Sequence, residues 1–269
     1  MDLQLKGKRA LVTGASSGIG AACARELAAE GVSVVAQGRD RDRAEAVATE
    51  CRALGVEAAT SLGEITSEEG CAAIAEAAVA ALGGIDILVN CAGGVVKDGN
   101  PDWTDITDAD WAQSFSLNVF SAVRLAQRLT PGMIERGWGR IVNISSVGGT
   151  QLSGRLLEYG SAKAALDHFS GNLSRRLAGH GITVNTVIPG TILTPQAERW
   201  INSLARQHGW PDDFAERERI YTQDFLAQPV PRLGRVEEIA AAVAFLASPR
   251  SGYTSGARIR IDGAGTRAL

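Results

Sequence analysis

Short apolar runs alternate with helix-period segments along nearly the whole chain of 269 residues. The runs RALVTG, VSVVAQG, VEAATS, IDILVN, GRIVNISS, ITVNTVI and ARIRID have the length and composition of buried strands. Helical patterns lie between most of them, near residues 18–30, 40–54, 67–82, 108–136, 159–178 and 236–247. This alternation predicts an α/β fold in which helices cover both faces of a parallel sheet.

The chain is expected to form a single domain over residues 1–269, because no linker or internal repeat interrupts the series. The segment 191–234 departs from the pattern, since charges and prolines alternate there with Trp200, Trp210, Phe214, Tyr221 and Phe225. We expect an insertion with its own helices, whose aromatic residues either contact substrate or form the core of a helical pair. Insertions after the carboxyl end of a strand often carry substrate contacts in doubly wound folds, which favours a substrate-binding role.

The charge balance gives no electrostatic footprint for nucleic acid or for an anionic membrane, since 27 basic and 30 acidic residues leave a net charge of -3. The longest apolar stretches, such as 239–247, are too short to span a membrane, and the N-terminus carries no secretory signal pattern. We therefore expect a cytoplasmic protein. The four cysteines and three histidines lack ligand-like spacing, so no metal site is predicted.

A glycine-rich turn follows the first expected strand. It reads TGASSGIG and places Gly14, Gly18 and Gly20 around Ser16, Ser17 and Ile19. Glycines at a strand-to-helix turn let the backbone approach a pyrophosphate, whose charge lies at the positive N-terminus of the next helix. This position in the first βαβ unit favours a dinucleotide site.

The end of the second expected strand bears on which dinucleotide binds. An acidic residue there would bond the ribose hydroxyls and repel a 2′-phosphate, but this chain has Gln37-Gly38-Arg39. Arg39 therefore favours NADP(H), with NAD(H) as the alternative cofactor.

A tyrosine and a lysine stand four residues apart in the stretch EYGSAKAAL, so Tyr159 and Lys163 share one face of a helix. Tyrosine is a poor proton donor near neutral pH unless a neighbouring cation stabilises its phenolate, and Lys163 supplies that cation. Ser146 ends the preceding strand, GRIVNISS, and parallel strand ends meet helix starts at one crevice. The hydroxyl of Ser146 can hold a substrate oxygen while Tyr159 exchanges its proton.

Together these motifs resemble the short-chain dehydrogenase/reductase family. The resemblance extends from about Lys8 to Gly263 and rests on TGASSGIG, NCAG, SLNVF, Ser146, YGSAK and PGTILT, which occur in that order. It implies a Rossmann-type, doubly wound sheet of about seven parallel strands. It also implies a catalytic tetrad in which Tyr159 is the general acid/base, Lys163 lowers its pKa and binds the nicotinamide ribose, Ser146 polarises the carbonyl, and Asn118 holds a water in the proton relay.

The same resemblance implies further cofactor contacts. Asn90, Ala92 and Gly93 would support the adenosine side, and Pro189, Gly190, Ile192 and Thr194 would flank the nicotinamide. Relatives commonly have an adenine-contacting aspartate where this chain has Gly63-Glu64-Ile65. Glu64 and Ile65 are therefore the candidate contacts, with the adenine contact either shifted or made only by backbone. Ser16 and Ser17 replace the basic residue of many NADP-preferring members, which leaves Arg39 carrying most of the NADP(H) prediction. Gly94 and residues 147–157 would line the substrate pocket.

The resulting prediction is an NADP(H)-dependent oxidoreductase that interconverts a ketone and a secondary alcohol. The pattern is similar to that of 3-oxoacyl-(acyl carrier protein) reductases, but the larger insertion favours a bulkier and more apolar small-molecule substrate. By the same resemblance we expect a homotetramer. The alternatives are an NAD(H)-dependent alcohol dehydrogenase of the same family, a catalytically silent cofactor-binding regulator, and an isomerase or dehydratase with tightly held cofactor.

Overall fold

The computed structural model describes residues 1–96, 102–152 and 154–267. Its centre is one parallel sheet of seven strands in the order β3-β2-β1-β4-β5-β6-β7. The strands are β1 (Arg9–Val12), β2 (Ser33–Gly38), β3 (Ala58–Leu62), β4 (Ile87–Asn90), β5 (Gly139–Ile144), β6 (Ile182–Pro189) and β7 (Arg258–Ile261). The strand order reverses between β1 and β4, which is the switch point where doubly wound folds bind their ligands.

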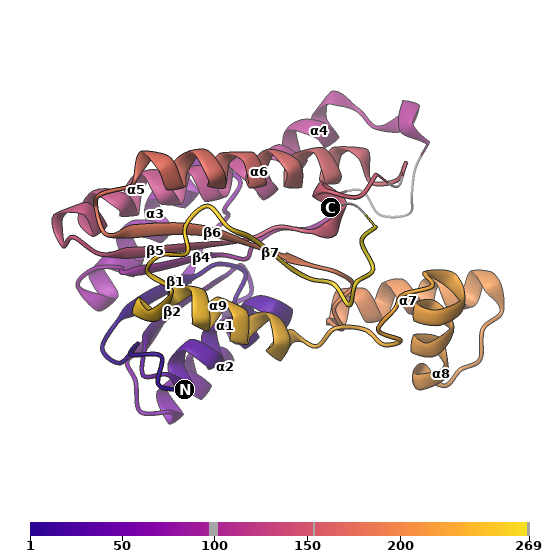
Figure 1. Cartoon of the computed structure of the whole chain (residues 1–269), viewed down its shortest axis with the longest axis horizontal. Helices are drawn as coiled ribbons and strands as arrows, with labels where there is room; N and C mark the ends of the chain where they lie inside the picture. Colours follow the sequence, from indigo (N-terminus) through magenta and orange to yellow (C-terminus); the bar gives the residue numbers. More distant parts are fainter. Residues whose placement is uncertain (97–101, 153, 268–269) are drawn as a thin grey trace.

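Helices cover both faces of the sheet, as the alternating pattern predicts (Figure 1). One face carries α1 (Gly18–Ala29), α2 (Arg41–Ala53) and α9 (Val236–Ala247), which share one apolar core with the strands. The other carries α3 (Glu68–Leu82), α5 (Ser121–Glu135) and α6 (Leu157–Arg176), around a second core. Central strands such as β1, β4 and β5 are therefore buried on both faces, which accounts for their continuous apolar runs.

The expected helix over 108–136 contains a π-helical turn. The structure has α4 (Asp108–Phe115), then the π turn η2 (Ser116–Phe120), then α5. The side-chain amide of Asn118 donates to the backbone carbonyl of Ser114 at 3.0 Å and so occupies an acceptor of the helical ladder. A side chain inserted into the ladder is a recognised cause of such a turn, and π turns often mark functional sites.

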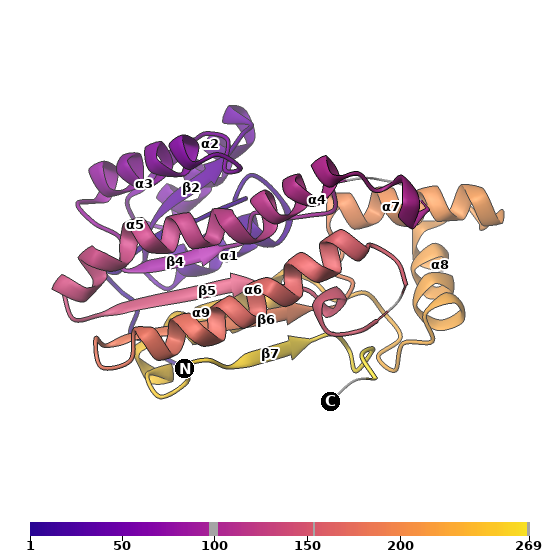
Figure 2. The same cartoon turned by 90° about the horizontal axis from the view of Figure 1, so that it is seen from above.

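The segment 191–234 forms helices of its own, which confirms that part of the prediction. It contains α7 (Pro195–His208), α8 (Phe214–Arg219) and a π turn, η4 (Ile220–Phe225). A small separate core of Ile201, Leu204, Tyr221 and Leu233 holds them together. In both views α7 and α8 project beyond the end of the sheet at which the parallel strands terminate (Figures 1 and 2). We call this segment the lid.

Within the described part of the chain, no helix is long and apolar enough to cross a membrane. The same residues contain no group of histidine, cysteine and acidic side chains that could hold a metal ion. The four cysteines, all of them described, carry free thiols.

Candidate active site

The turn between β1 and α1 has no room for side chains at two of its glycines. Gly14 has φ +65°, and a Cβ there would lie 3.0 Å from the Cα of Ala92. A Cβ on Gly20 would lie 2.4 Å from the carbonyl oxygen of Gly14. Such contacts exclude any larger residue, so the glycines let the loop pack directly against the chain that follows β4.

The N-terminus of α1 is open to a ligand. Ser17 stands at the N-cap position but its side chain makes no capping hydrogen bond, and the first turn of this fully described helix contains no acidic residue. By contrast, α2, α3, α4, α7 and α8 are each capped by the side chain of an Asp, Ser or Thr. The first backbone N–H groups of α1 and its dipole therefore suit the pyrophosphate of a dinucleotide, which fits this cradle.

Two residues that the sequence analysis did not select hold this loop in place. The Thr13 hydroxyl accepts hydrogen bonds from the N–H groups of Cys91 and Ala92, both at 3.0 Å. The Gln37 carboxamide accepts from the N–H of Gly14 and donates to the carbonyl of Gly63, both at 3.1 Å. A buried glutamine in an apolar strand is the signal that could have identified Gln37, because a buried amide needs hydrogen-bond partners.

The residues proposed for the adenosine end lie beside this loop. Arg39 is exposed and forms an ion pair with Glu64, with 3.7 Å between Nη1 and Oε2. Glu64 also accepts hydrogen bonds from the backbone and hydroxyl of Thr66. The side chain of Ile65 is buried in the second core, so only the backbone of that residue could contact a cofactor. Arg39 is thus placed where a solvent-exposed phosphate could reach it.

Lys163 lies buried on α6, and its ammonium donates to the carbonyl of Ile144 at 2.9 Å. The same Nζ lies 5.7 Å from the centroid of the Tyr159 ring. Burial lowers the pKa of Lys163 to about 8, because a desolvated ammonium is unfavourable. Tyr159 is half-buried and lies beside Ser146, since a Cβ on Gly148 would lie 3.5 Å from Ser146 Oγ and 3.6 Å from Tyr159 Cε1. Burial raises the phenol pKa of Tyr159, and the Ser146 hydroxyl opposes that rise.

Asn118 joins this group through the chain after β4. Its carboxamide oxygen accepts from the N–H of Gly94, and its amide donates to the carbonyl of Gly94, both at 3.0 Å. A Cβ on Gly93 would lie 2.8 Å from the Asn118 oxygen and 3.0 Å from Lys163 Nζ. The four residues of the expected tetrad thus form a chain of neighbours: Asn118 and Lys163 meet at Gly93, Lys163 lies against the ring of Tyr159, and Tyr159 lies beside Ser146.

Asn90 ends β4, with its side chain inside the fold. Its side-chain amide donates to the Asn143 carboxamide oxygen at 2.8 Å, and both side chains are buried within the fold. This hydrogen bond links β4 to β5.

The PGTILT motif closes the opposite side of the site. The N–H of Gly190 donates to Ile261, and a Cβ on Gly190 would lie 2.9 Å from the Cα of Asp262. Pro189 ends β6, Ile192 is buried and bridges to Gly234, and Thr194 caps α7. A Cβ on Gly18 would lie 3.3 Å from the Thr194 methyl group, so the motif reaches the glycine loop.

Leucines flank the loop that leads into α6. Leu152, Leu156 and Leu157 are exposed, and Leu156 adopts a left-handed backbone with φ +52°. Part of the expected pocket-lining segment, residue 153, lies outside the described residues. Left-handed backbone in a residue other than glycine is costly and is found mainly at functional sites, which agrees with a substrate-lining loop.

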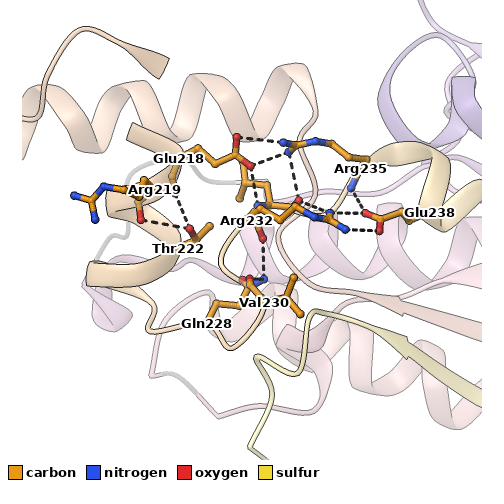
Figure 3. Close-up of polar contacts among 9 residues, drawn as sticks. Glu218, Arg219, Thr222, Gln228, Val230, Arg232, Arg235 and Glu238 are labelled. Atoms are coloured by element: carbon orange, nitrogen blue, oxygen red, sulfur yellow. Dashed lines mark hydrogen bonds and ion pairs between the residues drawn. The ribbon is translucent and has the colours of Figure 1, made fainter. Parts of the chain in front are cut away.

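Ion pairs attach the lid to the start of α9 (Figure 3). Glu218 of α8 accepts from Arg235 at 2.8 and 3.3 Å and from the backbone N–H of Leu233 at 2.9 Å. Arg232 pairs with Glu238 through two bonds of 2.8 Å, and this contact lowers the Glu238 pKa to about 2. The sequence analysis missed this attachment, because nothing in local spacing pairs Glu218 with Arg235.

Comparisons with known proteins identify the family of this chain. The model of the family described as short chain dehydrogenase matches residues 8–204. The chain is 36% identical to 7alpha-hydroxysteroid dehydrogenase of Escherichia coli K12 over 268 residues, which cover 100% of this chain and 98% of that protein. It is 37% identical to 3-oxoacyl-[acyl-carrier-protein] reductase FabG of Pseudomonas aeruginosa over 261 residues, or 97% and 98% of the two chains.

Solved structures give the same result. L-sorbose reductase from Gluconobacter frateurii, complexed with NADPH and L-sorbose, superposes with a TM-score of 0.93 at 34% identity over 100% of both chains. A 7α-hydroxysteroid dehydrogenase complexed with NADH and a 7-oxo bile acid superposes with a TM-score of 0.87 at 35% identity, over 100% of this chain and 98% of that one.

The fold and the site define a dinucleotide-binding oxidoreductase of CH-OH and carbonyl groups. The chain belongs to the short-chain dehydrogenase/reductase family.

Proposed function

We propose that the protein interconverts a ketone and a secondary alcohol with NADP(H) as its preferred cofactor. The observation that carries this proposal is the arrangement around Tyr159: a half-buried phenol beside the Ser146 hydroxyl, with a buried ammonium 5.7 Å from its ring. A phenol in this setting has both a hydroxyl neighbour for the substrate oxygen and a cation that stabilises its phenolate.

In the reducing direction, NADPH held at the glycine loop before α1 would supply the hydride for the carbonyl carbon. The residues of the chain itself act on the carbonyl oxygen of the substrate. The Ser146 hydroxyl donates a hydrogen bond to the carbonyl oxygen and stabilises the charge that develops there. Tyr159 donates its proton to that oxygen, and the Lys163 ammonium stabilises the resulting phenolate. Asn118 keeps the turn at Gly93 and Gly94 next to Lys163, so that the ammonium stays in place.

The cofactor preference rests on Arg39. Its guanidinium is exposed at the end of β2, whereas an acidic residue at that end would repel a 2′-phosphate. Relatives are divided, since the sorbose reductase structure contains NADPH and the bile acid dehydrogenase structure contains NADH. Glu64 already pairs with Arg39, so a 2′-phosphate would share the guanidinium with that carboxylate.

The lid is proposed to close the substrate site. Trp210, Phe214 and Tyr221 pack within the lid itself, which supports the core role for those three aromatics. Phe225 is partly exposed but stacks on Tyr221 and contacts Trp210 within the lid. Trp200 and the leucines of the loop before α6 are exposed and would supply apolar surface for a substrate. Sorbose and a bile acid in the two related structures show how widely substrates vary among relatives.

Two further expectations stay proposals. A homotetramer would cover apolar side chains that are exposed in the single chain, among them Phe120, Ile134 and Phe245 on or beside the long helices. Light scattering at micromolar concentration would measure the assembly, and a monomer would contradict it. The cytoplasmic location stays a prediction, which fractionation of cells producing the tagged protein would test.

The deciding experiment measures NADPH consumption by the wild type and by Tyr159→Phe on acyl thioesters, cyclic and steroid ketones, and keto-sugars. We expect turnover by the wild type on at least one class, a loss of about 100-fold or more in the variant, and unchanged NADPH binding. NADPH binding without consumption of any ketone would overturn the proposal and favour a regulator. Product formation without net NADPH change would favour an isomerase.

A further inference from the structure

Asp167 continues the face of α6 that carries the proposed proton-transfer pair. Tyr159, Lys163 and Asp167 follow one another at intervals of four residues, so successive members are neighbours one helical turn apart. The Asp167 side chain is buried, with 4% of its surface exposed. A buried carboxylate is rare without a specific partner, so its position one turn behind the buried Lys163 calls for an explanation.

A residue from the far edge of the sheet holds this carboxylate. Arg258, on the edge strand β7, donates to Asp167 Oδ2 at 2.7 Å, across 91 residues of sequence. The other oxygen, Oδ1, is buried without a hydrogen-bond partner among the described residues. Ser145 lies close by, and its hydroxyl donates to the carbonyl of Lys163 at 3.3 Å. One oxygen of the carboxylate is therefore held by Arg258, and the other has no hydrogen-bond partner among the described residues.

A row of polar residues crosses four neighbouring strands of the sheet and forms hydrogen bonds with α6. Asn90, Asn143, Thr186 and Arg258 are register partners in β4, β5, β6 and β7. Asn90 donates to Asn143, Asn143 donates to Ser170 of α6, and Arg258 donates to Asp167 of α6. Apolar residues would bury this interface at lower desolvation cost, so the charged pair at its end is a feature that packing alone does not require.

Electrostatic interactions connect Asp167 with Lys163. The Tyr159 ring lies 5.7 Å from the Lys163 ammonium, and Asp167 follows one helical turn later on α6. The charges of Asp167 and of the Cys91 thiolate, from the chain after β4, both act to raise the pKa of Lys163. The groups that face Asp167 are Ser145, Arg258 and Lys163. Burial raises the pKa of Asp167, while Ser145 and the two cations oppose that rise. Asp167 raises the pKa of Lys163 against the larger effect of burial.

We propose that Asp167 is a positioning residue for the Tyr159–Lys163 pair: its carboxylate stabilises the buried ammonium of Lys163, and Arg258 fixes the carboxylate. This rests on the proposed function in so far as Lys163 must be charged to stabilise the Tyr159 phenolate. The proposal gives the Asp167–Arg258 ion pair between α6 and β7 a role in proton transfer, although neither residue belongs to the expected tetrad.

The sign of the effect follows from charge alone. Removing a negative charge weakens proton binding at every nearby group, so Asp167→Asn lowers the pH at which the Tyr159–Lys163 pair loses its protons. The basic limb of the pH profile of kcat/KM for ketone reduction should move down by about one pH unit, as expected for charges one helical turn apart. Asp167→Glu, which restores the charge, should return the limb most of the way to its wild-type position.

The experiment compares pH profiles of the wild type, Asp167→Asn, Asp167→Glu and Glu69→Gln, after thermal melting confirms that each is folded. Glu69 is exposed on α3, so its variant removes the same charge far from the site and should leave the limb unchanged. An unmoved limb in Asp167→Asn, with or without a lower kcat, would make Asp167 a packing residue and overturn the proposal.

A second readout does not depend on turnover. The chain has three tyrosines, so isotope-labelled tyrosine gives few NMR signals, and Tyr159→Phe identifies the one that belongs to Tyr159. Its titration should move to lower pH in Asp167→Asn and stay in place in Glu69→Gln. A wild type that reduces no ketone would contradict the proposed function but leave this titration decisive, and an unmoved Tyr159 titration would overturn the role of Asp167.

Discussion

The glycine-loop side of the site and the lid are built in different ways. Gly14 and Gly20 meet other backbone atoms, and Gly93 meets the side chains of Asn118 and Lys163, so closely that a single added carbon would overlap them. The lid has a core of four buried residues and is joined to α9 by the Glu218–Arg235 ion pair. The first, rigid region therefore has no room for an added carbon, whereas polar contacts contribute to the attachment of the lid.

Under the proposed function, the two regions have different tasks. The rigid region would hold the groups that act on every substrate, where small displacements are costly. The lid would supply the surface that distinguishes one substrate from another, and segments that move with ligand are drawn from the less stable parts of a fold. Substitutions in the two regions should therefore change different kinetic constants.

The largest effect is expected from Gly93→Ala. The added carbon would lie 2.8 Å from Asn118 Oδ1 and 3.0 Å from Lys163 Nζ, so it would displace the ammonium. We expect kcat to fall by about 100-fold, the loss that a displacement of about 1 Å produces.

The matched control is Gly171→Ala, on the same helix as Lys163, where an added carbon meets nothing within 4 Å. It should leave kcat unchanged and raise stability by about 0.5–1 kcal/mol, as alanine does within a helix. Both variants are checked by thermal melting, and kcat is measured from initial rates. Equal losses of kcat in the two variants would show that the crowding at Gly93 is not the cause.

A smaller effect is expected from Arg39→Asp on the rim of the rigid region. The exposed guanidinium should contribute charged hydrogen bonds to a 2′-phosphate, so its reversal should change the ratio of NADPH to NADH affinity by about 20-fold. Titration of both cofactors measures this ratio. Arg41→Asp, at the first residue of α2, is the control. An unchanged ratio in Arg39→Asp would remove the basis for the NADP(H) preference.

Glu218→Gln tests the lid side. It neutralises a largely buried carboxylate that accepts bonds from Arg235 and Leu233, and should raise KM for the ketone by about fivefold with kcat nearly unchanged. Glu216→Gln is the control, because Glu216 pairs with Arg219 within the lid and not with the sheet. A loss confined to kcat would mean that the lid contributes to the chemistry and that the two regions are not separable.

The smallest effect concerns pH. Burial lowers the pKa of Lys163 from its ordinary value to about 8, so its ammonium is present below that pH and is lost as pH rises through it. Reduction should therefore weaken by about twofold from pH 7 to pH 8, since half of the ammonium is then lost. Initial rates at saturating NADPH measure this change, and a flat profile with an intact thermal melt would contradict a charged Lys163 in the reaction.

Much of the fold could be predicted from periodicity because each element is encoded locally. Val236–Ala247 and Gly18–Ala29 form helices within a residue of the expected bounds, and all seven expected strands are present. The π turn at Asn118 was not predicted, since it depends on how one side chain meets a carbonyl of its own helix. Ile65, predicted as a cofactor contact, has its side chain in the core, because alternation along a short loop does not reveal which side is buried.

The functional site likewise contains residues that the sequence reveals and residues that it does not. Tyr159, Lys163 and Ser146 could be selected because their spacing and strand-end position follow from helix and sheet geometry. Thr13 and Gln37 could not be ranked from sequence, because their importance lies in bonds to residues 78, 79, 23 and 26 positions away. Glu218 and Arg235 likewise carry no local signal of their pairing.

The sequence by itself determined the class of fold, the dinucleotide loop and the tyrosine–lysine pair, because periodicity and short spacings are properties of neighbouring residues. Only the tertiary structure decided that Gly93 is enclosed by Asn118 and Lys163, that Arg258 of β7 holds Asp167 behind the lysine, and that the lid is attached at Arg235. The physical reason is that burial and charge compensation depend on groups brought together across the sheet, and no local pattern specifies which distant partner a charged side chain will meet.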